Sequence, residues 1–77
     1  MFFLIQYDRR SGQLITFERF MKFERSKAEE VRLAMELKLL AEGVEREVVM
    51  LEAASEEALR KTHRRYFESL ETLAKAG

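Results

Sequence analysis

The stretch richest in reactive side chains is LRKTHRRYF, which runs from Leu59 to Phe67. It holds five basic or potentially basic residues in nine positions, and one of them is His63, the only histidine of the chain. Two kinds of chemistry could use such a stretch. Clustered cations bind nucleic-acid phosphates, and an imidazole can act as a general base where an acid orients it beside a reacting group.

The candidate nucleic-acid residues are the four cations Arg60, Lys61, Arg64 and Arg65. On a helix they fall on two flanks of an apolar stripe and not on one surface. Glu56 and Glu57 stand four residues before Arg60 and Lys61, at the spacing of helical ion pairs. From residue 55 to residue 75 there are five bases and four acids, so the field is nearly neutral. A nucleic-acid-binding or regulatory module is therefore the alternative hypothesis.

His63 lacks the partners that catalysis requires, because its helical neighbours are Leu59, Arg60, Tyr66 and Phe67 and none of them is an acid. We expect an imidazole at the edge of the core with one hydrogen-bond partner. The sequence contains neither a phosphate-binding glycine loop nor a nucleophile elbow. With no cysteine and one histidine, it also has few metal ligands. We expect no enzymatic activity, no metal and no cofactor.

Three strands are predicted to form the framework that carries these residues. Residues 2–7 are apolar on both alternating faces, apart from Gln6, which is typical of a central strand. DRRSG, residues 8–12, predicts a hairpin turn before a second strand at 13–20. Phe20 is out of phase with Phe17, so we expect a β-bulge near Glu18 or Arg19. Residues 46–53 are again apolar on both faces and predict the third strand.

Two helices complete the predicted elements. SKAE, residues 26–29, fits a capping box and predicts a helix that runs to Glu42, with Gly43 in the left-handed position that ends it. Ser55 is placed to cap a last helix that extends to about residue 75. The core stripe expected on this last helix is Leu59, Tyr66, Leu70 and Leu73.

The predicted fold class is α+β in the order ββαβα, as a single domain over residues 1–77. A right-handed crossover through the first helix sets the third strand parallel to the second. If the more apolar first strand lies between them, the sheet has the order 2-1-3 and is mainly antiparallel. Both helices are then expected on one face of this three-stranded sheet.

The first helix carries more apolar residues than one sheet can cover. Leu33, Leu37, Leu40 and Val44, with Ala34 and Ala41, form one apolar arc, which we assign to the core. Val31, Met35 and Leu39 form a second line on roughly the opposite side. Three interpretations of this second line remain open. The other helix covers it, it is ordinary exposed apolar surface, or it binds a partner.

Charge and length limit the partners. Fourteen acids balance fourteen bases, so no net field attracts a polyanion or an anionic membrane. No apolar run approaches the roughly 20 residues of a membrane helix, and MFFLI is interrupted at Gln6. We expect a cytoplasmic protein. A domain of 77 residues without disulfides has a thin core, and self-association is a common supplement.

The leading hypothesis is a small protein-interaction domain that works as a homodimer or beside a partner protein. With both helices on one face, the other sheet face would be open, although the first and third strands are apolar on both sides. Arg9 and Arg10 at the hairpin tip are expected near Glu42, Glu45 and Glu47. The candidate interaction residues are Phe2, Leu4, Val31, Met35, Leu39, Val48 and Met50.

Overall fold

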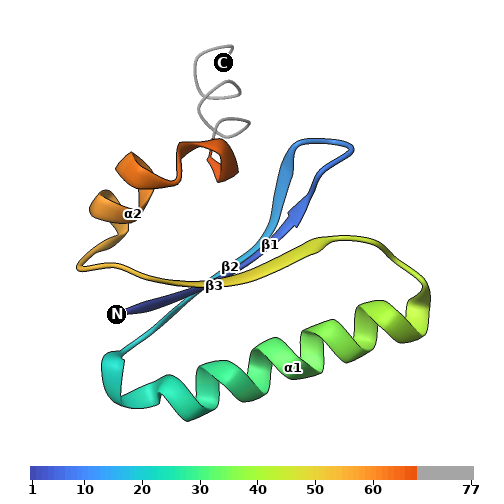
Figure 1. The fold of residues 1–77 in the computed structure, drawn as a ribbon, viewed down its shortest axis with the longest axis horizontal. Coiled ribbons are helices and arrows are strands. Elements are labelled where there is room, and N and C mark those ends of the chain that lie inside the picture. The colour runs from blue at the N-terminus through green and yellow to red at the C-terminus, as the bar shows by residue number, and fades with distance from the viewer. Residues whose placement is uncertain (68–77) are drawn as a thin grey trace.

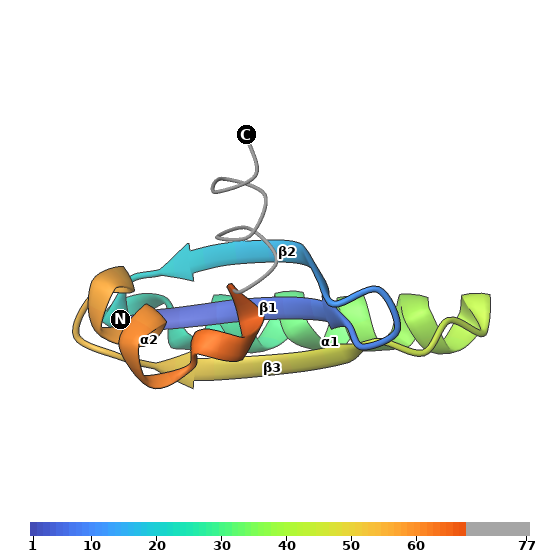
Figure 2. The same ribbon diagram turned by 90° about the horizontal axis from the view of Figure 1, so that it is seen from above.

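The computed structural model describes residues 1–67 as a three-layer arrangement with a sheet in the middle (Figures 1 and 2). The strands are β1 (Phe2–Asp8), β2 (Gln13–Phe20) and β3 (Glu47–Glu52), and the helices are α1 (Arg25–Glu42) and α2 (Glu56–Thr62). Two 3-10 turns, Lys22–Glu24 and Arg64–Tyr66, follow β2 and α2. The sheet has the order β2-β1-β3, and both pairings are antiparallel. The predicted ββαβα topology is confirmed.

The two helices lie on opposite faces of the sheet, so the prediction that both pack on one face is wrong (Figure 1). The cause is visible in β1, whose alternate residues serve two cores. Phe2 and Leu4 belong to the core under α1, whereas Phe3 and Ile5 belong to the core under α2. Each face of the central strand is thereby buried by a different helix.

The β2 strand follows the same division. Phe17 pairs with Ile5 and packs in the α2-side core, while Phe20 pairs with Phe2 and is buried on the α1 side. The change of phase therefore needs no bulge near Glu18 or Arg19, and the register is continuous there. The irregularity lies nearer the hairpin, where Gln6 pairs with Thr16 and Tyr7 with Leu14, so that Ile15 is the extra residue.

The hairpin turn and the end of α1 form as predicted. Asp8 accepts hydrogen bonds at its Oδ1 from the amides of Arg10 at 2.9 Å and Ser11 at 3.4 Å, which lowers the pKa of this carboxyl. Gly12 follows at a φ of 71°. Gly43 ends α1 at a φ of 67°, and the next amide, that of Val44, donates to the Leu39 carbonyl at 3.0 Å.

The start of α1 and the end of α2 differ from the prediction. The carboxylate of Glu24 caps the preceding 3-10 turn by accepting from the Met21 amide at 2.9 Å, so α1 begins at Arg25 and Ser26 is not the cap. Ser55 does cap α2, because its Oγ accepts from the Ala58 amide at 3.1 Å. However, α2 ends at Thr62, since His63 has an extended φ of −125° and a ψ of 55°. Leu70 and Leu73 lie outside the described residues.

Candidate functional site

The seven residues selected as interaction candidates all belong to the contact between α1 and the sheet, or lie beside it. Phe2 and Leu4 are buried there, and the half-buried side chains of Val31, Met35, Val48 and Met50 pack against them. Leu39, the seventh, is half-buried on the same side of α1. Within one copy of the chain these residues are core. The open sheet face that motivated their choice is covered by α2 and the turn after it.

The exposed apolar surface lies on the other side of α1. Leu33 and Leu37 are each 56% exposed, Leu40 is 78% exposed, and Val44 beyond the helix end is 36% exposed. Ala34 and Ala41 are exposed beside them. We call these six residues the outer arc: Leu33, Ala34, Leu37, Leu40, Ala41 and Val44. The assignment of the two helical lines to core and surface is therefore reversed relative to the prediction.

A small residue explains which side of α1 meets the sheet. Ala28 is the only α1 residue that is fully buried, and it continues the line of Val31 and Met35 toward the helix start. A methyl side chain lets the helix approach the sheet closely at this end, whereas the longer side chains follow farther along. The sequence carries this signal in the spacing of Ala28, Val31 and Met35, which share one helical face.

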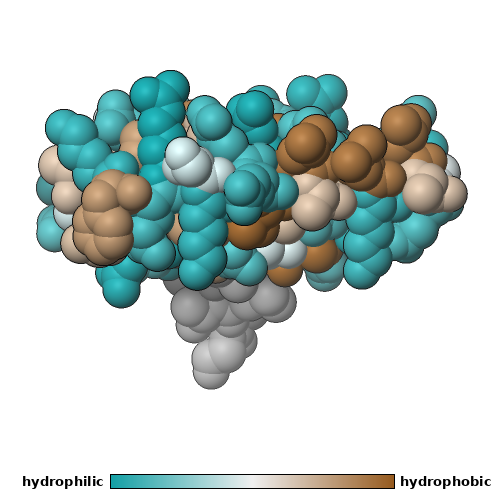
Figure 3. Space-filling model, turned by 90° about the horizontal axis from the view of Figure 1, so that it is seen from below, coloured by the Kyte–Doolittle hydropathy of each residue, from teal (hydrophilic) through white to brown (hydrophobic). Residues whose placement is uncertain are grey.

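The outer arc has the spacing of a helix-pairing seam. Its larger residues Leu33, Leu37 and Leu40 are separated by four and then three positions, and Val44 follows after four more. Alternating intervals of four and three keep apolar side chains on the face that meets a second helix. Figure 3 shows this face of the molecule, on which hydrophobic side chains gather toward one end, mostly hydrophilic ones follow, and a smaller separate hydrophobic patch lies near the other end.

The cations of the predicted nucleic-acid stretch are largely engaged by acids. Arg60 pairs with Glu56 at 3.4 Å and stacks over the Phe67 ring at 4.5 Å, and Lys61 pairs with Glu57 at 3.4 Å. Both ion pairs were predicted. Arg65 does not point along the helix surface with the other cations, because its side chain binds Glu47 on β3. Arg64 is exposed, and Glu68, which stands four residues after it in the sequence, lies outside the described residues.

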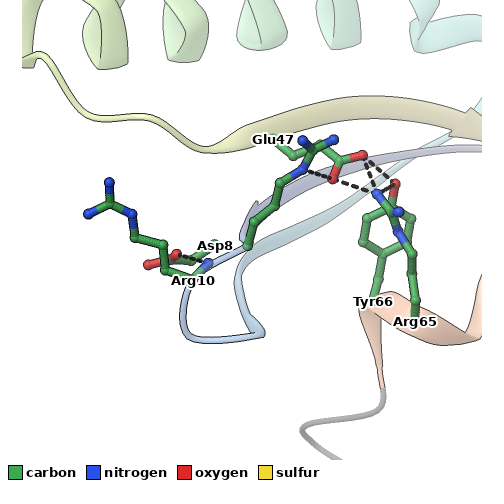
Figure 4. Close-up of polar contacts among 6 residues, drawn as sticks. Asp8, Arg10, Glu47, Arg65 and Tyr66 are labelled. Carbon is green, nitrogen blue, oxygen red and sulfur yellow. Dashed lines mark hydrogen bonds and ion pairs between the residues drawn. The ribbon is translucent and has the colours of Figure 1, made fainter.

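Glu47 on β3 contacts polar side chains from two distant parts of the chain, the hairpin tip and the turn after α2 (Figure 4). Its carboxylate is 15% exposed and accepts from Arg65 Nη2 at 2.6 Å to each oxygen, from Arg9 Nε at 3.2 Å and from the Tyr66 hydroxyl at 2.8 Å. Of the acids expected near the hairpin tip, this is the one that Arg9 contacts. The involvement of Arg65 and Tyr66 was not predicted, since helical spacing gives no sign of a turn at His63.

The protonation of this cluster follows from its contacts. Burial alone would raise the pKa of Glu47, but the hydrogen bonds from Tyr66 and Arg9 and the charge of Arg65 outweigh it. The pKa of Glu47 therefore lies below its usual value of 4.5. Burial and the hydrogen bond to Glu47 raise the pKa of Tyr66. The cluster is thus a fixed anion held by two arginines and a neutral phenol, which is a structural arrangement without a proton to exchange near pH 7.

His63 lies at the edge of the core, as expected. It is half-buried, its Nδ1 lies 2.9 Å from the Thr62 hydroxyl, and its ring stacks beside Tyr66 with the centroids 6.5 Å apart. In the part of the chain that the structure describes, no carboxylate contacts the imidazole. Within the described residues the imidazole therefore has no acid to orient it, which an acid–base role would require.

One groove of about 580 Å³ opens between the end of α1, the hairpin tip and the start of β3. Leu40 and Val44 of the outer arc form part of its wall. Its charged side chains are balanced, three of each sign: Arg9, Arg10, Arg46, Glu36, Glu45 and Glu47. This balance favours neither an anionic nor a cationic small ligand. The groove adjoins the outer arc, because Leu40 and Val44 belong to both.

Within residues 1–67, no group of three or more histidine or acidic side chains is arranged to hold a metal ion. None of the described helices is both long enough and apolar enough to cross a bilayer. No protein-family model, no curated protein and no solved structure matches this chain.

Proposed function

We propose that the protein is a small cytoplasmic protein-interaction domain that works as a homodimer through the outer arc of α1. The observation that carries the proposal is the exposure of three leucines at seam spacing, Leu33, Leu37 and Leu40, on a helix whose opposite side already packs on the sheet. Scattered exposed leucines are ordinary on protein surfaces. Three on one helical face, with Ala34 and Ala41 beside them, form a continuous patch.

The energetics favour covering this patch. Burying a leucine contributes about 1.5–3 kcal/mol, and part of that is regained for each of the three leucines on both copies. A domain of this size has a free energy of unfolding of only about 5 kcal/mol, so association would add substantially to its stability. A two-fold contact of one patch with itself is the simplest closed arrangement.

The proposal is tested by light scattering over a range of protein concentrations on wild type, Leu37→Ser and the matched control Ile15→Thr. Ile15 is also an exposed apolar residue, at 40%, but it lies on β2. We expect wild type and the control to approach twice the chain mass as concentration rises, with a melting temperature that rises in parallel. Leu37→Ser should stay monomeric and folded. A monomeric mass for wild type at every concentration would refute the proposal.

A further inference from the structure

The outer arc lies between two flanks of opposite charge. With 3.6 residues per turn and Leu37 taken as the centre of the arc, Glu29 and Glu36 lie about 80° and 100° to one side. Lys27 and Lys38 lie about 80° and 100° to the other side by the same projection. We call Glu29 and Glu36 the acidic flank, and Lys27 and Lys38 the basic flank; all four residues are exposed.

The two flanks differ in how far they are already neutralised. Glu29 lies 3.5 Å from Arg25 Nε, and Glu36 lies 3.9 Å from Arg32 Nε, on the side of each acid away from the arc. Both acids keep about half of their side-chain surface exposed, and a carboxylate has room for further hydrogen bonds. Among the residues that the structure describes, Lys27 and Lys38 form no ion pair.

We propose that a second copy of this chain covers the outer arc with its own α1 helix running parallel, so that each acidic flank lies against the partner's basic flank. This inference rests on the proposed homodimer and deepens it. A two-fold axis along the helices brings opposite flanks together, so acid meets base on both sides. A two-fold axis across the helices would bring each flank against its own copy, acid on acid and base on base. Electrostatic complementarity selects the parallel arrangement.

The parallel arrangement also predicts where the contact is strongest. It places each leucine of the outer arc beside its own copy, Leu33, Leu37 and Leu40 forming successive layers. One helical turn nearer the start of α1, Glu30 would meet the partner's Glu30, which is repulsive. The contact is therefore centred on the second half of α1, where the hydrophobic side chains gather in Figure 3.

The orientation is measured by pulsed electron spin resonance on a nitroxide label at Ser26→Cys, because the chain has no other cysteine. In the parallel dimer the two labels lie beside each other, and we expect a distance below about 20 Å. In an antiparallel dimer that sets Leu33 against the partner's Leu40, the two Ser26 positions are 21 residues apart along the axis, or about 32 Å. Dilution with unlabelled wild type should reduce the dipolar signal in both cases.

Charge exchange provides an independent readout. In the parallel dimer, Glu36→Lys and Lys38→Glu should each weaken association about three- to tenfold, and the double variant should restore it. A distance of about 32 Å, or single variants without effect, would overturn the parallel arrangement and leave the homodimer standing. A monomeric wild type would refute both proposals together, and a stable complex with a different protein in place of the dimer would do the same.

Discussion

The two faces of the sheet are closed by segments of different kinds. On the α2 side the helix is only seven residues long, and aromatic rings complete the cover. Phe17 lies at the centre, stacked on Phe3 with centroids 5.6 Å apart and meeting Phe67 edge-on at 5.5 Å. Tyr7 meets Tyr66 edge-on at 5.2 Å. A short helix followed by a turn seals this face because each ring buries a large apolar area.

On the α1 side a helix of 18 residues contributes only one fully buried side chain, that of Ala28. The rest of the cover comes from half-buried Val31 and Met35 against Phe2 and Leu4. Three of the leucines of the helix, Leu33, Leu37 and Leu40, point away from the sheet. The length of a helix therefore does not measure how much apolar surface it buries within its own chain. The α2 side is complete in one copy, whereas the α1 side carries a surplus of apolar surface.

The largest effect is expected at Phe67, one of the rings that cover the α2 side of the sheet. Phe67→Ala removes a fully buried side chain from the aromatic cluster and should lower the free energy of unfolding by about 3–4 kcal/mol. Urea titration followed by circular dichroism measures this. Phe23→Ala is the matched control, because Phe23 is 86% exposed and its loss should cost little. Equal losses in the two variants would show that the turn after α2 is not part of the core.

A smaller effect is expected at the charged contact that holds this turn to β3. Glu47→Gln weakens the hydrogen bonds from Arg65, Arg9 and Tyr66 and should lower the free energy of unfolding by about 1–2 kcal/mol at pH 7. Glu52→Gln, on the exposed end of the same strand, is the control and should cost little.

The pH dependence of the Glu47 contribution has a definite sign. The pKa of Glu47 is lower in the folded chain than its usual value of 4.5, so its stabilising contribution is complete above pH 4.5. The contribution is lost as the pH falls through the folded pKa. The difference between wild type and Glu47→Gln should therefore be constant from pH 5.5 to pH 7 and shrink below pH 4.5. A difference that grows on acidification would contradict this assignment.

Most of the fold was predictable because it depends on local signals. The Asp8–Gly12 turn, the left-handed Gly43 and the Ser55 cap each follow from the backbone needs of a few adjacent residues. The strand order followed from one comparison, since β1 is the most apolar strand and lies at the centre. The helix end at His63 was not predictable from periodicity, because the apolar spacing continues through it and the turn depends on distant contacts with Glu47.

The candidate site was harder to predict because an amphipathic pattern does not say which of two apolar lines faces inward. The outer arc has more leucine than the line of Val31 and Met35, so hydrophobicity alone assigned it to the core. Packing against the sheet decides which line faces inward, because Ala28, on the line of Val31 and Met35, contacts the sheet core and is fully buried. Apolar patterning also does not say which face of the sheet a helix covers, so both helices were predicted on one face, although β1 is apolar on both sides.

The reversed faces of α1 give a prediction that depends on protein concentration. At a concentration low enough to keep the chain monomeric, Met35→Ala should lower the free energy of unfolding by about 1–2 kcal/mol, because Met35 packs on the sheet. Leu37→Ala should change it by less than about 0.5 kcal/mol under the same conditions, since Leu37 is mostly exposed. At high concentration the order should change, because Leu37→Ala alone removes the stabilisation that association provides. A larger loss for Leu37 in the monomer would restore the original assignment of the core.

The smallest effect is expected at His63, which lies at the end of α2 beside the aromatic cluster. The imidazole is half-buried at the end of α2, and its polar contact is with the neighbouring Thr62 hydroxyl at 2.9 Å. A glutamine at this position can accept or donate a similar hydrogen bond, and the aromatic cluster is complete without the imidazole ring. His63→Gln should therefore change the free energy of unfolding by less than about 0.5 kcal/mol and leave the dimer mass unchanged. The losses measured for Phe67→Ala and Phe23→Ala give the upper and lower reference values for this change in the free energy of unfolding. A loss comparable to that of Phe67→Ala would place the imidazole in the core, and a changed mass would extend the interface to the α2 side of the sheet.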